Sequence, residues 1–109
     1  MIISMNRTRF HIISEQTLQN GKTKEGANKE YRHIIYEYNL DISGDISPVH
    51  IEKAVQNILK YLDIAFNNLE IGYTEETKQY NIRFTVPDKL LNEQYSVDYT
   101  NEGIVRVNL

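Results

Sequence analysis

The sequence lacks cysteine and tryptophan, and it has only two prolines and five glycines among its 109 residues. Without cysteine, neither a disulfide framework nor a thiolate metal site is available, and the composition fits a reducing compartment. So few prolines and glycines argue against a disordered or low-complexity chain. Since 109 residues is close to the commonest domain size, we expect a single domain over residues 1–109.

Long apolar runs are also missing, and this bears on where the protein acts. The longest runs are a few residues, so the sequence offers no membrane-spanning helix. Residues 1–4 are too short for the apolar core of a signal peptide, and the positive charges of Arg7 and Arg9 follow them instead of preceding them. We therefore expect a cytoplasmic protein without membrane contact. Abundant isoleucine, asparagine, tyrosine and lysine, all with AT-rich codons, favour a bacterial or phage origin.

Catalytic signatures are absent as well. There is no glycine-rich phosphate loop, no Gly-x-Ser-x-Gly motif and no cysteine nucleophile. The three histidines, His11, His33 and His50, have no spacing typical of metal ligands along one element. We therefore expect no enzyme activity, no cofactor and no metal.

Two alternatives for a metal site stay open at this point. His11 and His33 could approach each other across a strand pair and, with Glu15 or Glu37, form a two-histidine, one-carboxylate set. The loop that contains Asp41, Ser43, Gly44 and Asp45 could hold a cation, although turn formation before a helix explains the same residues more simply.

The clearest predicted element is a long amphipathic helix over residues 48–66. Ser47 stands at the N-cap position and Pro48 at the first helical position, where its missing N–H costs nothing. Ile46 and Ile51 occupy the two positions of a hydrophobic staple. Apolar residues then recur with helical spacing at positions 51, 54, 55, 58, 59, 62, 65 and 66. Asn67 and Asn68 suit the helix exit.

Two hairpins with readable registers follow the helix. The first joins residues 69–74 to 79–86 and pairs apolar with apolar and acid with base: Tyr73 with Tyr80, Ile71 with Ile82, Leu69 with Phe84, and Glu70 with Arg83. The second turns at residues 101–103, with Gly103 in the left-handed position, and pairs Tyr99 with Val105, Val97 with Val107, Tyr95 with Leu109, and Asp98 with Arg106. Residues 87–94 between them are predicted as a short helical turn and crossover, with Leu90 and Leu91 facing inward.

A third hairpin is predicted at the N-terminus, from strands at residues 8–16 and 31–42. Residues 16–30 form its mobile or projecting basic loop, which carries Lys22, Lys24 and Lys29 as a basic arm. Two registers stay open. One pairs Arg9 with Glu37, and the other pairs His11 with Glu37 and Glu15 with His33.

The predicted order is strand, strand, helix and four strands. Neighbouring strands with one helix indicate an α+β fold, in which an antiparallel sheet of about six strands carries the helix on one face.

One face of the N-terminal hairpin breaks the polar pattern seen in the other two hairpins. It is aromatic and aliphatic with histidines where the others are polar, which indicates that something covers it. Basic side chains beside such residues are typical of an interface. The candidate interface residues are His11, Ile13, Tyr31, Arg32, His33 and Ile35. The cover is the chain's own crossover, a second copy of the protein, or a protein partner.

Charge is divided unevenly along the chain. Residues 1–36 hold six basic and three acidic residues, net +3, whereas residues 37–109 hold six basic and twelve acidic residues, net −6. This pattern favours a small non-catalytic protein-binding domain of the inhibitor, immunity or anti-defence type, which occludes its partner through the N-terminal hairpin face. A self-assembling structural or chaperone-like subunit is the alternative. Nucleic-acid binding through the basic arm is a further alternative, against which the acidic remainder argues.

Overall fold

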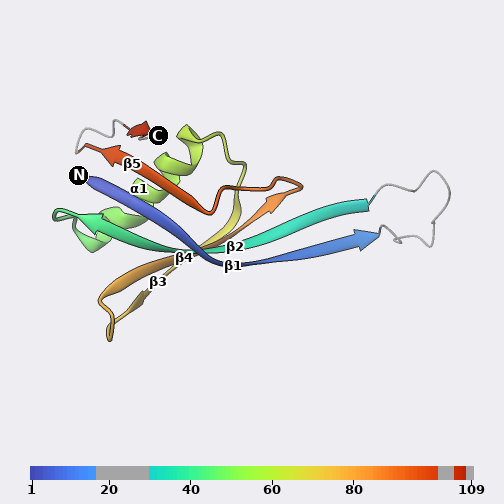
Figure 1. The fold of residues 1–109 in the computed structure, drawn as a ribbon, viewed down its shortest axis with the longest axis horizontal. Helices are drawn as coiled ribbons and strands as arrows, with labels where there is room; N and C mark the ends of the chain where they lie inside the picture. Colours follow the sequence, from blue (N-terminus) through green and yellow to red (C-terminus); the bar gives the residue numbers. More distant parts are fainter. Residues whose placement is uncertain (17–29, 101–104, 108–109) are drawn as a thin grey trace.

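The fold is an antiparallel sheet with one helix across one of its faces (Figure 1). The computed structural model describes residues 1–16, 30–100 and 105–107. In chain order the elements are β1 (Ile2–Gln16), β2 (Glu30–Ser43), α1 (Pro48–Tyr61), β3 (Asn67–Thr74), β4 (Gln79–Pro87), β5 (Gln94–Tyr99) and the three-residue β6 (Val105–Val107). The predicted α+β class, with an antiparallel sheet and one helix, is confirmed.

The strands lie side by side in the order β3-β4-β2-β1-β5-β6. The two central strands are therefore β1 and β2, and the two later hairpins are placed on opposite sides of them. β1 begins at Ile2, well before the predicted start at residue 8, because Ile3 and Met5 are buried and residues 2–6 pair with β5.

The register of β1 against β2 is the first of the two alternatives. Arg9 lies opposite Glu37, and its Nε atom is 3.1 Å from a carboxylate oxygen of Glu37. The alternative pairing of His11 with Glu37 and of Glu15 with His33 is wrong. A bulge at Thr8 adds one residue to β1. The apolar side chains at odd-numbered positions before the bulge therefore point to the same face of the sheet as those at even-numbered positions after it.

The hairpin of β3 and β4 has the predicted register over most of its length. Tyr73 pairs with Tyr80, and Glu70 pairs with Arg83. The one-to-one pairing of Leu69 with Phe84 is interrupted, because a bulge between Asn67 and Glu70 places both Asn68 and Leu69 opposite Phe84. The sequence pattern alone carries no sign of this extra residue.

The pairing of β5 with β6 also matches the prediction: Tyr99 lies opposite Val105, Val97 opposite Val107, and Asp98 opposite Arg106. The predicted turn at residues 101–103 and the pairing of Tyr95 with Leu109 fall outside the described residues, as do residues 17–29 of the predicted basic loop.

The helix ends earlier than predicted, at Tyr61 instead of residue 66. Asp63 adopts a left-handed conformation with φ 58°, its N–H donates to the Lys60 carbonyl, and the N–H of Ile64 donates to the Leu59 carbonyl. This pair of bonds is a Schellman motif that terminates the helix, with aspartate in the position usually held by glycine. The exit at Asn67 and Asn68 is therefore wrong.

The core lies between α1 and the sheet. The helix contributes Ile51, Ala54, Val55, Ile58 and Leu59, five of the predicted apolar positions. The sheet contributes buried side chains from all of the longer strands except β3, whose Leu69 and Ile71 are partly buried against it. In the crossover after β4, Leu91 is buried as predicted, but Leu90 is 75% exposed and the segment contains no helical turn.

Candidate functional site

The first two strands extend beyond the part of the sheet that α1 covers (Figure 1). A helix of 14 residues is about 21 Å long, because each residue rises 1.5 Å. A strand of 15 residues spans about 50 Å at 3.3 Å per residue. One helix therefore cannot cover the whole of β1 and β2. We call their far part, residues 9–16 of β1 and 30–37 of β2, the arm. Ile34 and Tyr36 of the arm are buried in the core.

The predicted interface residues meet on the side of the arm that faces away from α1. His11 lies opposite Ile35, and Ile13 lies opposite His33. We call these four residues the outer face. His11 and Ile13 are exposed, and His33 and Ile35 are partly buried. The structure thus brings together four of the six predicted residues on one surface.

The remaining predicted residues are placed only in part. The backbone of Tyr31 lies opposite Glu15, and that of Arg32 lies opposite Ser14. The side chains of Tyr31 and Arg32 fall outside the described part of the structure, and Lys22, Lys24 and Lys29 fall outside it altogether.

The side of the arm that faces toward α1 was missed by the sequence analysis. Phe10 and Ile12 share the core face of β1, yet they are 44% and 43% exposed, and Ile13 on the outer face is 37% exposed. The arm therefore displays apolar side chains on both faces. The only signal in the sequence was the predicted strand at residues 31–42, about 40 Å long, against about 28 Å for the predicted helix at 48–66.

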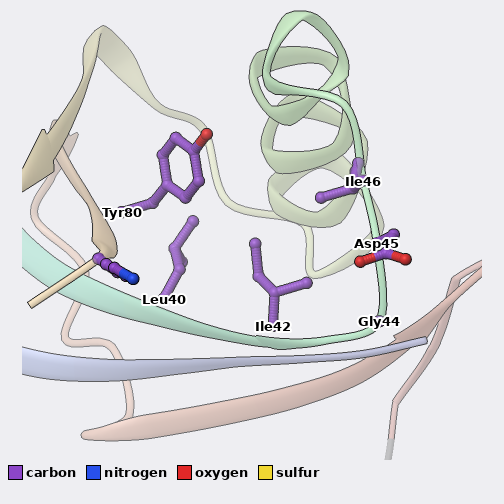
Figure 2. Close-up of a pocket in the computed structure, with 7 residues that line it drawn as sticks. Leu40, Ile42, Gly44, Asp45, Ile46 and Tyr80 are labelled. Carbon is purple, nitrogen blue, oxygen red and sulfur yellow. The ribbon is translucent and has the colours of Figure 1, made fainter. Parts of the chain in front are cut away.

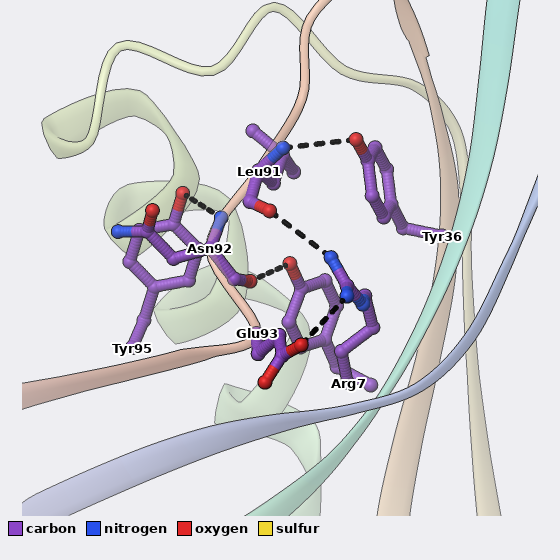
Figure 3. Close-up of polar contacts among 7 residues, drawn as sticks. Arg7, Tyr36, Leu91, Asn92, Glu93 and Tyr95 are labelled. Carbon is purple, nitrogen blue, oxygen red and sulfur yellow. Dashed lines mark hydrogen bonds and ion pairs between the residues drawn. The ribbon is translucent and has the colours of Figure 1, made fainter.

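The crossover segment, which could have covered the outer face, lies on the other side of the sheet. The hydroxyl of Tyr36 accepts a hydrogen bond from the Leu91 N–H at 2.9 Å (Figure 3). It also donates to the Lys89 carbonyl at 2.7 Å, and the hydroxyl of Tyr38 donates to the Asn92 carbonyl at 2.7 Å. Both tyrosines are buried on the core face. Their contacts place the crossover against the core, not over the outer face.

Arg7 completes this network at the base of the arm. Its guanidinium donates to the Leu91 carbonyl at 3.1 Å and forms an ion pair with Glu93 at 3.4 Å (Figure 3). The guanidinium also lies 4.7 Å from the centre of the Phe10 ring. Its own backbone N–H donates to the Glu93 carbonyl at 2.8 Å. Arg7 therefore connects the covered part of β1 to the first apolar residue of the arm.

Tyr38 is not suited to proton transfer at neutral pH. Burial, with a smaller contribution from the neighbouring Tyr95, raises the pKa of its hydroxyl well above the ordinary value. The group stays protonated and acts as a hydrogen-bond donor, which is the role that its contact with Asn92 requires.

The metal alternatives gain no support from the geometry. Glu37, one of the carboxylates considered for the His11 and His33 set, is ion-paired with Arg9. Asp41 accepts hydrogen bonds from the side-chain amides of Asn6 and Gln79, at 3.0 and 2.8 Å. Among the described residues, no group of three or more histidine, aspartate or glutamate side chains is arranged to hold a metal ion.

A small open pocket of about 240 Å³ lies where β2 leaves the sheet toward α1 (Figure 2). Leu40, Ile42, Ile46 and Tyr80 provide its apolar lining, and Gly44, Asp45 and Lys78 complete it. Ile42 and Ile46 in its lining are partly buried against the core.

Among the described residues, no helix is both long enough and apolar enough to cross a membrane. No protein-family model, curated protein or solved structure matches this chain.

Proposed function

We propose that this protein is a small non-catalytic protein-binding domain and that the arm is its docking surface. The observation that supports this function is the exposure of apolar side chains on both faces of one projecting strand pair, Phe10 and Ile12 on one side and Ile13 on the other. An exposed apolar surface on an antiparallel sheet is typical of a protein interaction site.

The low stability expected for the end of the arm supports the same proposal. In the described part of the structure, the end of the arm, residues 14–16 of β1 and 30–32 of β2, is a two-stranded ribbon. Such a ribbon is marginally stable by itself in water, because it buries little apolar surface. Beyond Pro87, which lies opposite His33, β2 has no strand on its second side among the described residues. Docking of a partner would bury the apolar side chains of the arm and stabilise it, so binding and ordering of this segment favour each other.

The kind of partner follows from the chemistry of the outer face. His11, Ile13, His33 and Ile35 offer apolar and imidazole surface, while Arg9 beside them is already ion-paired with Glu37. This surface suits a protein with a complementary apolar patch better than a phosphate backbone, for which unpaired cations are needed. We favour an inhibitor, immunity or anti-defence role in the cytoplasm, in which the arm occludes the partner's working surface.

The test compares two variants: one is altered on the arm, and the other is altered on α1. Ile13→Ser combined with Ile35→Ser alters the outer face, and Val49→Ser removes an apolar side chain that is 78% exposed on α1, away from the arm. Each purified protein is immobilised and exposed to a lysate of the source organism, and circular dichroism verifies that it is folded. The captured protein is then identified and its affinity for each variant measured by calorimetry.

We expect the wild type and Val49→Ser to bind the same protein with equal affinity, and the arm variant to lose at least tenfold in affinity. Equal binding by the arm variant would show that the docking surface lies elsewhere. Capture of nucleic acid that is released by moderate salt would instead favour the nucleic-acid alternative.

A further inference from the structure

We propose that the pocket where β2 leaves the sheet toward α1 binds an apolar α-amino acid, with Lys78 holding the carboxylate of the ligand and Asp45 its ammonium group. The pocket lies at the end of β2, whereas the arm contains the beginning of the same strand. The proposal therefore goes beyond the docking function of the arm and does not depend on it.

The pocket exists because two neighbouring strands end at different levels. β4 pairs with β2 only as far as Tyr80, which lies opposite Leu40, while β2 continues to Ser43. In the described part of the structure, no strand pairs with the β4 side of β2 beyond that point, and α1 begins only at Pro48. Figure 2 shows the side chains of Leu40, Ile42 and Tyr80 directed into the space that remains.

The side chains that form the body of the pocket are apolar. Leu40 is buried, and Ile42, Ile46 and Tyr80 are partly buried against the core. Such a lining favours an aliphatic or aromatic group, which leaves water when it binds. The volume of about 240 Å³ is smaller than the roughly 300–1,000 Å³ typical of sites for drug-sized ligands, so the ligand is a single small molecule.

Three polar groups of the same pocket have no partner in the described part of the structure. The carboxylate of Asp45, the ammonium of Lys78 and the hydroxyl of Tyr80 take part in no hydrogen bond or ion pair there. Asp45 and Lys78 line one pocket without pairing with each other. A ligand that carries both charges can therefore lie between them and form two charge-assisted hydrogen bonds.

The backbone at Lys78 supports a role for its side chain. Lys78 adopts a left-handed conformation with φ 54°, which glycine and asparagine adopt more readily than lysine. A residue held in an unfavourable conformation at the lining of a pocket points to a functional reason for its side chain. The only other positive φ in this lining, among the described residues, belongs to Gly44, where no side chain is involved.

The two charges of the pocket select the class of ligand. A phosphate or a dicarboxylate would find one cation, Lys78, and would be repelled by Asp45. A metal ion would find one carboxylate, whereas calcium or magnesium takes several oxygen ligands. One carboxylate, one ammonium and an apolar side chain match all three parts of the lining, and an apolar α-amino acid combines them in the smallest molecule.

The test titrates leucine and phenylalanine into the whole protein and follows the backbone amide signals by NMR. We expect saturable shifts at Gly44, Ile46 and Tyr80, with a dissociation constant of about 1 mM for a ligand of this size. Isovalerate, which lacks the ammonium group of leucine, and isoamylamine, which lacks its carboxylate, should each bind about fivefold more weakly.

Two variants assign the charges separately. Lys78→Asn, in which asparagine tolerates the left-handed backbone, should weaken leucine about fivefold and leave isoamylamine unchanged. Asp45→Asn should weaken leucine to the same extent and leave isovalerate unchanged. Lys60→Gln removes an exposed lysine in the last turn of α1 and is the matched control, for which we expect wild-type binding. Circular dichroism verifies that each variant is folded.

The absence of saturable shifts with both amino acids would overturn the proposal, as would shifts confined to residues outside the pocket. Unchanged leucine binding in both Lys78→Asn and Asp45→Asn would overturn the assignment of the two charges. The docking of a protein on the arm is decided separately, by the affinity of the Ile13 and Ile35 variant.

Discussion

The hydroxyl of Tyr38 donates a hydrogen bond of 2.7 Å to the carbonyl oxygen of Asn92, 54 residues further along the chain. Tyr38 lies at the centre of the sheet, fully buried, with its ring stacked on Phe84 at a centroid distance of 5.9 Å. The crossover that leads to β5 therefore ends in a defined position against the core. β5 follows the crossover directly in the chain and pairs with the start of β1. This contact therefore helps to align β5 beside β1.

Replacing Tyr38 by phenylalanine tests this contact and its dependence on pH. At neutral pH we expect Tyr38→Phe to lower the free energy of unfolding by about 1–3 kcal/mol, because the Asn92 carbonyl loses its donor. Burial raises the pKa of Tyr38 in the folded state, so its stabilising contribution is complete below the unfolded pKa of about 10 and declines as the pH rises above it. The difference between wild type and variant should therefore shrink in alkaline solution.

Urea unfolding at several pH values measures this effect. Tyr61→Phe is the control, because the Tyr61 side chain is 55% exposed on α1 and the loss of its hydroxyl should change stability little. A difference between wild type and Tyr38→Phe that stays constant well above pH 10 would contradict the assignment of the buried donor.

Ile58 tests the packing of α1 on the sheet. It is fully buried in the middle of the helix, so Ile58→Ala should lower the free energy of unfolding by about 2–5 kcal/mol through loss of apolar contact and formation of a cavity. Val49→Ala on the same helix is highly exposed and should change it by no more than about 0.5 kcal/mol. Chemical denaturation of the two variants beside the wild type measures both values; similar small effects would place Ile58 outside the core.

Asp63 tests how the helix ends. It holds a left-handed conformation with φ 58°, which glycine adopts without strain and a β-branched residue does not. We expect Asp63→Val to be less stable than Asp63→Gly by about 1–2 kcal/mol. Thermal or urea unfolding of the two variants gives the comparison, and equal stability would argue that the helix continues past Tyr61 in solution.

The start of the helix and most hairpin registers could be predicted from the sequence because neighbouring residues decide them. Ser47 holds the N-cap position, although its side chain makes no capping hydrogen bond, and Pro48 begins the helix as expected. Ile51, one of the two predicted staple residues, is buried. Glu70 and Arg83 are joined by a short connection, so the alternation of apolar residues allows only one register there.

The candidate site could be predicted only in part. Strand alternation was enough to place His11, Ile13, His33 and Ile35 on one face, and the structure shows these four together. It was not enough to show that Phe10 and Ile12 on the opposite face are also exposed, because exposure depends on how far the helix reaches along the sheet.

The sequence by itself determined the α+β class, the start of α1 and the pairing of strands that are close along the chain, since each depends on local periodicity and turn residues. Tertiary structure alone decided that β4 joins β2 while β5 joins β1, that bulges interrupt β1 and β3, and that buried tyrosine hydroxyls hold the crossover. The physical reason is that these features depend on contacts between distant segments, whose partners a local pattern does not specify.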